Sequence, residues 1–298
     1  MKSSCICKKK SSFKPYIIYK NETVFKAYEG TVIGQCESCR ILKTFPSKKN
    51  KLFNPVITKA EDYEKRKKEF ENLFAPLTEA VRRHTVKKGS VLDVGCSSGI
   101  LLSLLKRKGF DVYGLEPNRQ AYLYAKKTIK KNVFKMTLSQ FLRGLSLRAK
   151  HSIAKQSINL IRLPRLYPRN DRMAFDCIIY NHVLEHIEDV NSEFLLIKKV
   201  LKKSGFLIIG VPNTHNMIFK IRRKYWEPLL PNEHVWHFNT KYLVKHLQKH
   251  KFEIIKISFE DDARKSYPVL KRIYFTLLSF LNKMMGTGEA VLIVSKKI

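Results

Sequence analysis

The chain has 298 residues, of which 44% are hydrophobic, and this content suffices for one large core or for one domain with a small additional module. The opening residues MKSSCICKKKSSFK lack the apolar run of a secretory signal, and no apolar stretch is long enough to span a bilayer. We therefore expect a cytoplasmic protein in which one domain carries a small extra module.

The chain is strongly basic. Lys plus Arg number 58 against 25 Asp plus Glu, which gives a formal net charge of +33. Such a charge favours an anionic partner such as nucleic acid, a membrane surface or an acidic glycan. Because lysines occur along the whole chain, including ordinary helix faces, only local clusters of charge argue for a partner.

The first 55 residues lack helical periodicity and contain four of the six cysteines. Thiols stay reduced in the cytoplasm, so these cysteines indicate metal-binding or core roles before disulfides. Cys36 and Cys39 have the two-residue gap of a zinc knuckle, whereas Cys5 and Cys7 are one residue closer. Four thiolates in two pairs would form a closed structural zinc site, and the alternative is a flexible arm with incidental cysteines.

From residue 60 onward, predicted helices and strands alternate. Residues 60–84 carry an apolar stripe at helical spacing. Regular alternation of strands and helices argues for a parallel sheet covered by helices on both faces, hence a doubly wound α/β fold. The predicted strands are residues 90–95, 111–116, 132–138, 175–181, 205–211, 252–259 and 290–297, and the predicted helices between them are residues 100–109, 118–131 and 187–204.

Two inserts interrupt this pattern, near residues 142–173 and 262–288. The first is basic and interleaved with apolar residues. In the second, residues 268–285 form an apolar stripe at helical spacing with lysine and arginine off the stripe. Basic amphipathic segments can lie on an anionic membrane, and they can equally form a lid over a substrate pocket. The stripe consists of Leu270, Ile273, Tyr274, Leu277, Leu281, Met284 and Met285.

The stretch VLDVGCSSG joins the first strand of the alternating region to the next helix. In a doubly wound sheet this turn is where nucleotide ligands bind, because glycines allow close approach and the helix N-terminus offers free amides. Glu116 follows Asp93 by 23 residues, at the end of the next strand, where a carboxylate can bind both ribose hydroxyls. The turn lacks the G-x-G-x-x-G pattern of dinucleotide sites, and its acid suits a cationic ligand such as S-adenosylmethionine.

Five segments in order, VLDVGCSSG, YGLEPN, FDCIIYNHVLEHIEDV, GFLIIGVPN and PNEHVWHFNTKYL, resemble the motifs of Rossmann-type S-adenosylmethionine-dependent methyltransferases. The resemblance covers about residues 91–257 and the last strand, and implies a mostly parallel seven-stranded sheet within residues 56–298. Many relatives carry an N-terminal zinc-ribbon-like segment, which supports such a module over residues 1–55. The cofactor-binding residues implied are Asp93, Gly95, Cys96, Ser97, Gly99, Glu116, Pro117, Leu138, Asn181 and His182.

Two positions depart from the family pattern. Ser97 replaces the usual middle glycine, so its side chain restricts the backbone beside the methionine carboxylate. The loop KMTLSQF lacks the acid that often meets the adenine amino group, and adenine contacts near Leu138 are then expected from backbone or apolar groups. Cys96 and Cys177, on predicted core elements, are expected to be buried as small apolar residues.

Histidines are the candidates for the chemistry, because methyl transfer needs a positioned acceptor and a base that removes its proton. His182, Glu185 and His186 are spaced i, i+3 and i+4, which predicts one face of a helix starting there. His234 and His237 lie in PNEHVWHFN. We expect His234 as the base and His182 as the second catalytic candidate; helix capping and aromatic packing are the structural alternatives.

A magnesium site similar to that of small-RNA ribose methyltransferases, whose helix reads Glu-x-x-Glu-His, is a further alternative. Here His182 stands where the first Glu would be, and because magnesium prefers oxygen ligands this exchange counts against it.

The resemblance implies a methyltransferase with S-adenosylmethionine as cofactor and a structural zinc. We expect a small-molecule or glycan-type acceptor, with lipid-linked acceptors reached at the inner face of the membrane within this class. One alternative is an RNA methyltransferase, against which no aromatic-rich RNA-binding module is recognisable. A non-catalytic, zinc-bearing binding protein with a methyltransferase-like shell is the other.

Overall fold

The computed structural model describes residues 1–7, 10–20, 26–47, 66–151, 174–262, 264 and 267–298. The chain divides into two compact units. Unit 1 comprises Met1–Pro55, Asn181–Asn191 and Ile208–Lys296, and unit 2 comprises Val56–Tyr180, Ser192–Leu207 and Lys297–Ile298. The N-terminal 55 residues thus belong to the same unit as most of the C-terminal third. Much of the basic insert predicted near residues 142–173 lies outside the described residues.

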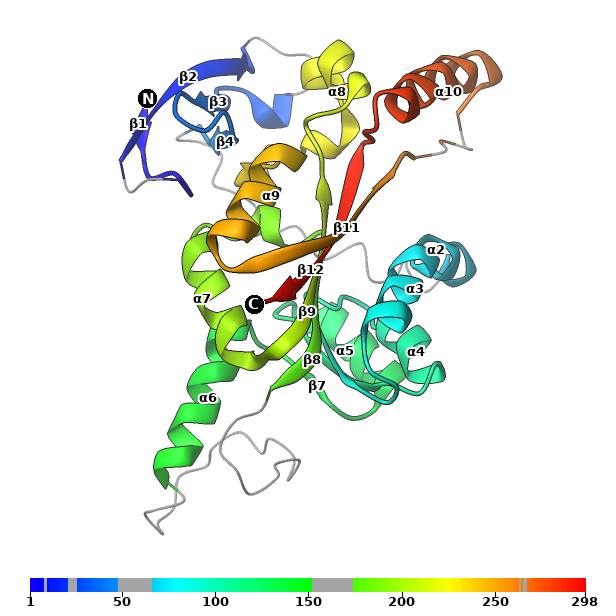
Figure 1. The fold of residues 1–298 in the computed structure, drawn as a ribbon. Helices are drawn as coiled ribbons and strands as arrows, with labels where there is room; N and C mark the ends of the chain where they lie inside the picture. Colours follow the sequence, from blue (N-terminus) through cyan, green and yellow to red (C-terminus); the bar gives the residue numbers. More distant parts are fainter. Residues whose placement is uncertain (8–9, 21–25, 48–65, 152–173, 263, 265–266) are drawn as a thin grey trace. The chain divides into compact units, whose positions relative to one another are not determined.

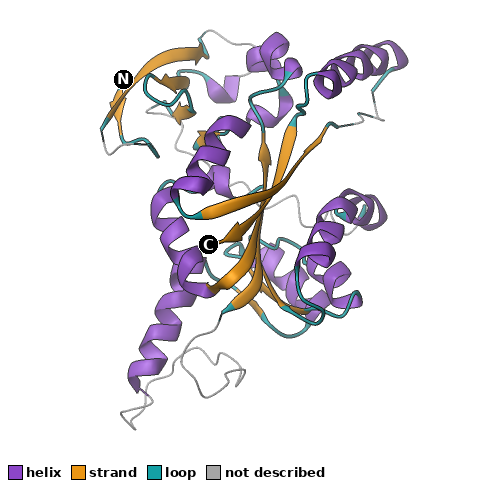
Figure 2. Cartoon of the chain, in the orientation of Figure 1, coloured by secondary structure: helices purple, strands orange, loops and turns teal. Residues whose placement is uncertain are grey.

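A seven-stranded, mostly parallel sheet forms the centre of the fold, as the alternating pattern predicts (Figures 1 and 2). Its strand order is β11-β12-β9-β8-β5-β6-β7. β5 pairs in parallel with β6, Val91 opposite Val112, and with β8, Val91 opposite Cys177. The strands β5, β6 and β8 are buried on both faces, so these three are apolar almost throughout. The strands are β5 (Ser90–Val94), β6 (Asp111–Leu115), β7 (Val133–Phe134), β8 (Phe175–Asn181), β9 (Leu201–Pro212), β11 (Phe252–Glu260) and β12 (Ala290–Lys297).

Amphipathic helices cover the strands of unit 2, with α3 and α4 on the opposite side from α6 and α7 in Figure 1. In α4, residues Leu101, Leu102 and Leu105 are buried at helical spacing. Asn118 caps α5 by accepting hydrogen bonds from the Gln120 and Ala121 amides. The helices are α2 (Lys67–Leu73), α3 (Ala75–His84), α4 (Ile100–Arg107), α5 (Arg119–Ile129), α6 (Leu138–His151) and α7 (Val190–Val200).

Two predicted boundaries in unit 2 are wrong. The third strand, predicted to extend to Leu138, contains only Val133 and Phe134, because Thr137 and Gln140 form reciprocal side-chain-to-amide hydrogen bonds that start α6. The helix predicted to reach residue 204 ends at Val200. The next residues begin β9, and the Lys297 ammonium donates to the carbonyls of Lys198 and Leu201 at this transition.

A small antiparallel sheet in unit 1 contains the N-terminal segment. Its order is β1-β2-β3-β4-β10, so the last strand comes from a distant part of the chain. Trp236 pairs with Lys43, and the Lys43 ammonium lies 4.8 Å from the Trp236 ring centroid. The strands are β1 (Lys2–Ser3), β2 (Ser11–Ile18), β3 (Val32–Cys36), β4 (Leu42–Phe45) and β10 (Trp236–His237).

The second predicted insert, near residues 262–288, lies in unit 1. It forms α10 (Val269–Met284), which packs against α8 (Met217–Arg222). Its buried residues are Phe275, Leu278 and Asn282, a narrow seam. The apolar stripe identified in the sequence, for which a membrane contact and a packed lid were both expected, is exposed, Leu270 by 84% and Met284 by 71%. The remaining helix of this unit is α9 (Thr240–Lys249).

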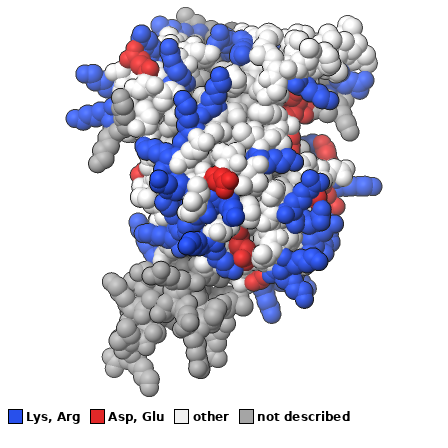
Figure 3. All heavy atoms as spheres, viewed as in Figure 1, with Lys and Arg blue, Asp and Glu red and all other residues white. Residues whose placement is uncertain are grey.

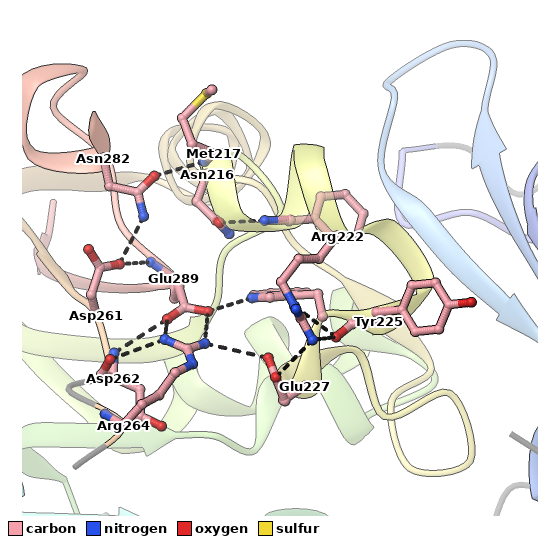
Figure 4. A network of polar contacts seen from close by, with 12 residues as sticks. Asn216, Met217, Arg222, Tyr225, Glu227, Asp261, Asp262, Arg264, Asn282 and Glu289 are labelled. Atoms are coloured by element: carbon pink, nitrogen blue, oxygen red, sulfur yellow. Dashed lines mark hydrogen bonds and ion pairs between the residues drawn. The ribbon is translucent and has the colours of Figure 1, made fainter. Parts of the chain in front are cut away.

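A buried polar network holds α10 in place (Figure 4). The Arg264 guanidinium donates two 2.6 Å hydrogen bonds to the Glu289 carboxylate, and Trp226 Nε1 donates a third at 2.7 Å. Asn282 accepts from the Met217 amide and donates to Asp261. These bonds connect α10 and α8 to the residues that follow β11 and precede β12.

Basic side chains are spread over the face drawn in Figure 3 rather than gathered in one patch. The region of α10 at the upper right of that view is mostly uncharged. Among the described residues, no helix combines the length and the apolar character required to cross a bilayer.

Candidate active site and cysteine cluster

The turn after β5 has the geometry that its sequence predicts. Gly95 and Gly99 have φ angles of 73° and 79°, in the left-handed region that glycine adopts without strain. Ser97, at the position of the usual middle glycine, also has a positive φ of 47°. Ser97 therefore adopts a conformation that is strained for a residue with a side chain. The Gly95 and Cys96 amides both donate to the Leu115 carbonyl, which fixes the turn to the end of β6.

Two buried carboxylates flank this turn in unit 2. Asp93 is 3% exposed and Glu116 is 5% exposed. Burial, and secondarily the Glu116 charge, raises the pKa of Asp93 to about 8. Burial also raises the pKa of Glu116, against the effect of two amide hydrogen bonds. Among the described residues neither acid forms an ion pair, so the electrostatics of the turn favour a cationic ligand.

The Glu116 carboxylate also fixes the local backbone. It accepts a 2.9 Å hydrogen bond from the Ser97 amide and a 2.8 Å bond from the Asn118 amide. One side chain thus ties the glycine turn to the start of α5. Each oxygen retains lone pairs, so the carboxylate still has the capacity to accept from the two hydroxyls of a ribose.

The other predicted cofactor residues have varied surroundings. Cys96 is buried, and a Cβ at Gly114 would lie 2.7 Å from its sulfur, so Cys96 packs against β6. Pro117 is exposed, and Leu138 is buried at the start of α6. Asn181 ends β8, where a Cβ at Gly210 would come within 2.4 Å of its side-chain oxygen.

In unit 1, a cluster of histidines surrounds Glu185, but not on the helix that the spacing predicts. His182 has a φ of 54° and its amide donates to the Gly210 carbonyl, so the chain turns sharply there. A short 3-10 helix covers Leu184–His186, and the α-helix begins only at Val190. The prediction of one helical face is therefore wrong, although Glu185 still lies close to both His182 and His186.

The Glu185 carboxylate is the centre of this cluster. Its Oε1 lies 3.4 Å from His182 Nδ1 and 4.0 Å from His234 Nε2. Burial opposes ionisation of Glu185, but the histidines outweigh it and lower its pKa to about 2. The His182 side chain is 53% exposed, whereas that of His234 is 5% exposed. The i, i+3 spacing of His182 and Glu185 was the signal for this contact; the role of Glu185 as a shared partner was not predicted.

His237 lies next to the cluster, with its ring centroid 6.1 Å from that of His234, but it bonds to the small sheet. Its Nε2 is 2.9 Å from the Thr44 hydroxyl within the small sheet, and the side chain is buried. Burial lowers the pKa of His237 to about 3. A neutral, hydrogen-bonded imidazole in this position holds β10 against β4.

The four N-terminal cysteines converge in unit 1. The sulfurs of Cys5 and Cys39 are 3.6 Å apart, and those of Cys7 and Cys36 are 3.8 Å apart. All four sulfurs lie within 4.8 Å of one another, and the thiols are free. Tetrahedral zinc with bonds of about 2.3 Å sets sulfurs about 3.8 Å apart, so the donor set fits this ion. The hydrogen bond with Cys39 lowers the pKa of Cys5 to about 5, which already favours a thiolate.

A sequence model of the family described as "Methyltransferase domain" matches residues 64–257. The chain belongs to the methyltransferase-domain family. Its fold is similar to that of a SAM dependent methyltransferase from Archaeoglobus fulgidus, with a TM-score of 0.50 and 19% identity over 76% of this chain and 98% of that one. S-adenosylmethionine as cofactor is supported by this membership together with the acid pair at the turn.

Two curated relatives are named ubiquinone biosynthesis O-methyltransferase. The one from Pelagibacter ubique (strain HTCC1062) is 25% identical over 128 residues, and the one from Rickettsia typhi (strain ATCC VR-144 / Wilmington) is 24% identical over 144 residues. These matches cover 43% and 46% of this chain. The chain spans about half the length of these relatives, 44% and 47%.

Proposed function

We propose that this protein is an S-adenosylmethionine-dependent methyltransferase that acts on a small-molecule acceptor. The observation that carries the proposal is the pair of buried acids, Asp93 and Glu116, at a glycine turn between β5 and α4. A sulfonium and an ammonium group favour ionised Asp93, and ribose hydroxyls suit the remaining acceptor capacity of Glu116. The family match and the sequence resemblance support the same ligand.

When bound, S-adenosylmethionine supplies an electrophilic methyl group on a sulfonium. An acceptor heteroatom that takes this methyl group would have to give up its proton, so the protein must position the acceptor and supply a base. We assign the removal of this proton to His182. The Glu185 carboxylate lies 3.4 Å from its Nδ1, and the half-exposed side chain can meet an acceptor.

His234 is the second candidate for the base. From the sequence alone His234 is the expected base, but its side chain is only 5% exposed, which favours the exposed His182 for contact with an acceptor. The two histidines share Glu185, so the paired variants His182→Gln and His234→Gln separate their roles. If His234 is the base, its variant loses more kcat than the His182 variant.

The acceptor class is supported by the two relatives named ubiquinone biosynthesis O-methyltransferase, since ubiquinone is a small molecule. The test is methyl transfer from radiolabelled S-adenosylmethionine into extracts separated into water-soluble molecules, lipids, glycans and RNA. We expect label in a small-molecule or lipid fraction and none with Glu116→Ala. Glu79→Ala, an exposed acid on α3, is the control. Label in RNA alone would contradict the proposed acceptor and support the RNA alternative.

We also propose that α10 rests on an anionic bilayer. The helix contains Lys271, Arg272 and Lys283 and no acid, and each basic residue near an anionic surface contributes about 1 kcal/mol. A large exposed apolar surface next to basic residues is the pattern of helices that lie in the membrane interface. The exposed apolar residues are Val269, Leu270, Ile273, Tyr274, Leu277, Phe280, Leu281 and Met284.

An open surface cavity of about 560 Å³, lined by α10, by the end of β11 and by the residues that precede β12, extends this proposal to lipid-linked acceptors. Phe280 and Lys283 line it, and both are also exposed on the outer surface of α10. The volume lies in the range of small-molecule sites. A lipid-linked acceptor in the bilayer would therefore meet the cavity at the membrane surface.

Flotation with phosphatidylglycerol-containing vesicles tests the membrane proposal. We expect the wild type to float and the double variant Leu277→Glu, Phe280→Glu to remain at the bottom. Leu123→Glu, on the exposed face of α5 in unit 2, is the matched control. Equal flotation of the wild type and the double variant would contradict the proposal that α10 binds the membrane.

Structural zinc at Cys5, Cys7, Cys36 and Cys39 is the third proposal. The sulfur separations support it, and the site is closed, since four thiolates leave no position for a substrate. The expected role is to hold the small sheet together. Metal analysis of the purified protein tests it: loss of zinc in Cys36→Ser but not in Cys177→Ala supports the assignment.

A further inference from the structure

A second group of potential metal ligands lies apart from the cysteines. One carboxylate oxygen of Glu185 and ring nitrogens of His186 and His234 fall within 4.8 Å of one another. The three residues come from two segments that backbone bonds hold together. The Val235 amide donates to the Glu185 carbonyl at 2.9 Å, and His186 Nδ1 lies 2.9 Å from the Glu233 carbonyl.

The Glu185 side chain is buried without a hydrogen bond to its carboxylate from the described residues. It is 1% exposed, yet neither carboxylate oxygen accepts a hydrogen bond from the part of the chain that the structure describes. Buried charges in proteins are normally paired, hydrogen-bonded or coordinated to a metal. Its nearest partners, His182 and His234, lie at 3.4 Å and 4.0 Å. An ion bound to the carboxylate would satisfy it directly.

The chemistry of the donors selects the kind of ion. A carbonyl can only accept, so the contact to Glu233 requires His186 to carry its proton on Nδ1 and leaves the Nε2 lone pair free. Two imidazoles with one carboxylate are the ligand set of zinc and related divalent transition metals in sites that keep open positions. Magnesium prefers oxygen ligands and fits this set poorly.

We propose that Glu185, His186 and His234 bind a divalent transition-metal ion of the zinc type, separate from the cysteine site. Because the site has only three protein ligands, a water or an acceptor oxygen can complete the coordination. An acceptor hydroxyl bound there would ionise more readily. His182, beside the same carboxylate and half exposed, would take the proton, and His234 would act as a ligand rather than as the base. This catalytic role rests on the proposed function, whereas metal binding does not.

Metal content of the purified full-length protein is the first test. After exposure to Zn²⁺ and removal of excess, we expect about two ions per chain in the wild type and about one in His186→Gln and in Glu185→Gln. His84→Gln, on α3 in unit 2, is the control and should keep both ions. Equal zinc content in the wild type and both cluster variants would overturn the proposal.

Cobalt substitution guards against misfolded variants. Thiolate-bound Co²⁺ gives a charge-transfer band that nitrogen and oxygen ligands do not, so this band reports the cysteine site alone. We expect His186→Gln to keep the band while one equivalent of cobalt is lost. A variant that loses the band is unfolded at the cysteine site and says nothing about the second site. In that case the second site is tested on the wild type alone.

X-ray absorption at the zinc edge of the wild type provides that independent measurement. With both sites filled, we expect about half sulfur ligands near 2.3 Å and half nitrogen or oxygen ligands near 2.0 Å. Sulfur ligands alone would overturn the proposal. If zinc at the second site leaves the methyl-transfer rate unchanged, the catalytic role fails while the methyltransferase assignment stands, and loss of S-adenosylmethionine binding is a separate readout of that assignment.

Discussion

The turn after β5 and the cluster around Glu185 are built differently. The turn takes its chemistry from one contiguous stretch, Asp93 to Gly99, and from Glu116 on the neighbouring strand. The cluster joins His182–His186 to His234, and its second segment is held by β10 of the small sheet. Cofactor binding is therefore expected to depend on local structure, and acceptor chemistry on distant parts of the chain. Mutations at the cysteine site should therefore leave cofactor binding at the turn intact.

The largest expected effect comes from the cysteine site. Cys36→Ser should strongly lower the free energy of unfolding of unit 1, because a structural zinc site contributes on the order of 10 kcal/mol directly to folding. Since β4 pairs with β10, methyl transfer should also fail while unit 2 keeps its affinity for S-adenosylmethionine. Chemical denaturation and calorimetry measure the two effects, with Cys177→Ala as control. If the variant lost its affinity for S-adenosylmethionine together with the zinc, cofactor binding would not be independent of unit 1.

Glu116→Ala should produce the opposite pattern. Hydrogen bonds to a charged group contribute about 1.5–3 kcal/mol each, so loss of the ribose contacts should weaken cofactor binding by about 3 kcal/mol, or about a hundredfold. Zinc content should not change. Because Glu116 also accepts from the Ser97 and Asn118 amides, Glu116→Gln, which keeps one acceptor oxygen, should retain intermediate affinity. Unchanged affinity in the alanine variant would refute the role assigned to this acid.

His182→Gln should lower kcat by about a hundredfold with little change in the KM for S-adenosylmethionine, since general base catalysis contributes at least this factor. The matched variant His237→Gln alters a buried histidine bonded to Thr44, and should lower stability more than kcat per folded molecule. Steady-state kinetics corrected for the folded fraction distinguishes them. A parallel loss of kcat in both variants would point to a structural role for His182.

The smallest predicted effect concerns acid stability of unit 1. Burial, and then His250 and Lys249, lowers the pKa of His246 to about 3. The unfolded chain binds this proton below about pH 6.5 whereas the folded chain does not, so the stabilising contribution is complete above that pH and is lost as the pH falls toward 3. At pH 5 the loss is about 2 kcal/mol. Denaturation at pH 7 and 5 should show this loss, and His246→Leu should make the difference between the two pH values about 2 kcal/mol smaller, while the contribution of the buried His237 remains.

The sequence predicted the seven strands and the acid pair because both depend on local patterns. An apolar run followed by a glycine turn specifies a buried strand and its exit. Asp93 lies near the end of β5, opposite Gly114, and Glu116 directly follows the adjacent parallel strand β6, so both acids lie at the same edge of the sheet. The third strand was overestimated because Thr137 and Gln140 form a cap that strand periodicity does not reveal.

The histidine cluster was only partly predictable. Spacing brought His182 and Glu185 together, but the positive φ of His182 replaced the expected helix by a turn. The approach of His234 depends on β10, which has two residues and hence no periodicity to read. On α10, the apolar pattern did not predict which residues are buried. A polar residue, Asn282, lies in the buried seam and fixes it through hydrogen bonds to Met217 and Asp261.

Calorimetric titration with S-adenosylmethionine, in buffers of different ionisation enthalpy, tests the central claim most directly. At pH 7 the pKa of about 8 keeps most of Asp93 protonated, so binding of the cationic ligand should release up to about one proton and strengthen toward pH 8. Asp93→Asn should bind more weakly and release none from this site. No heat of binding at millimolar ligand, or binding with identical proton release in wild type and Asp93→Asn, would contradict the account.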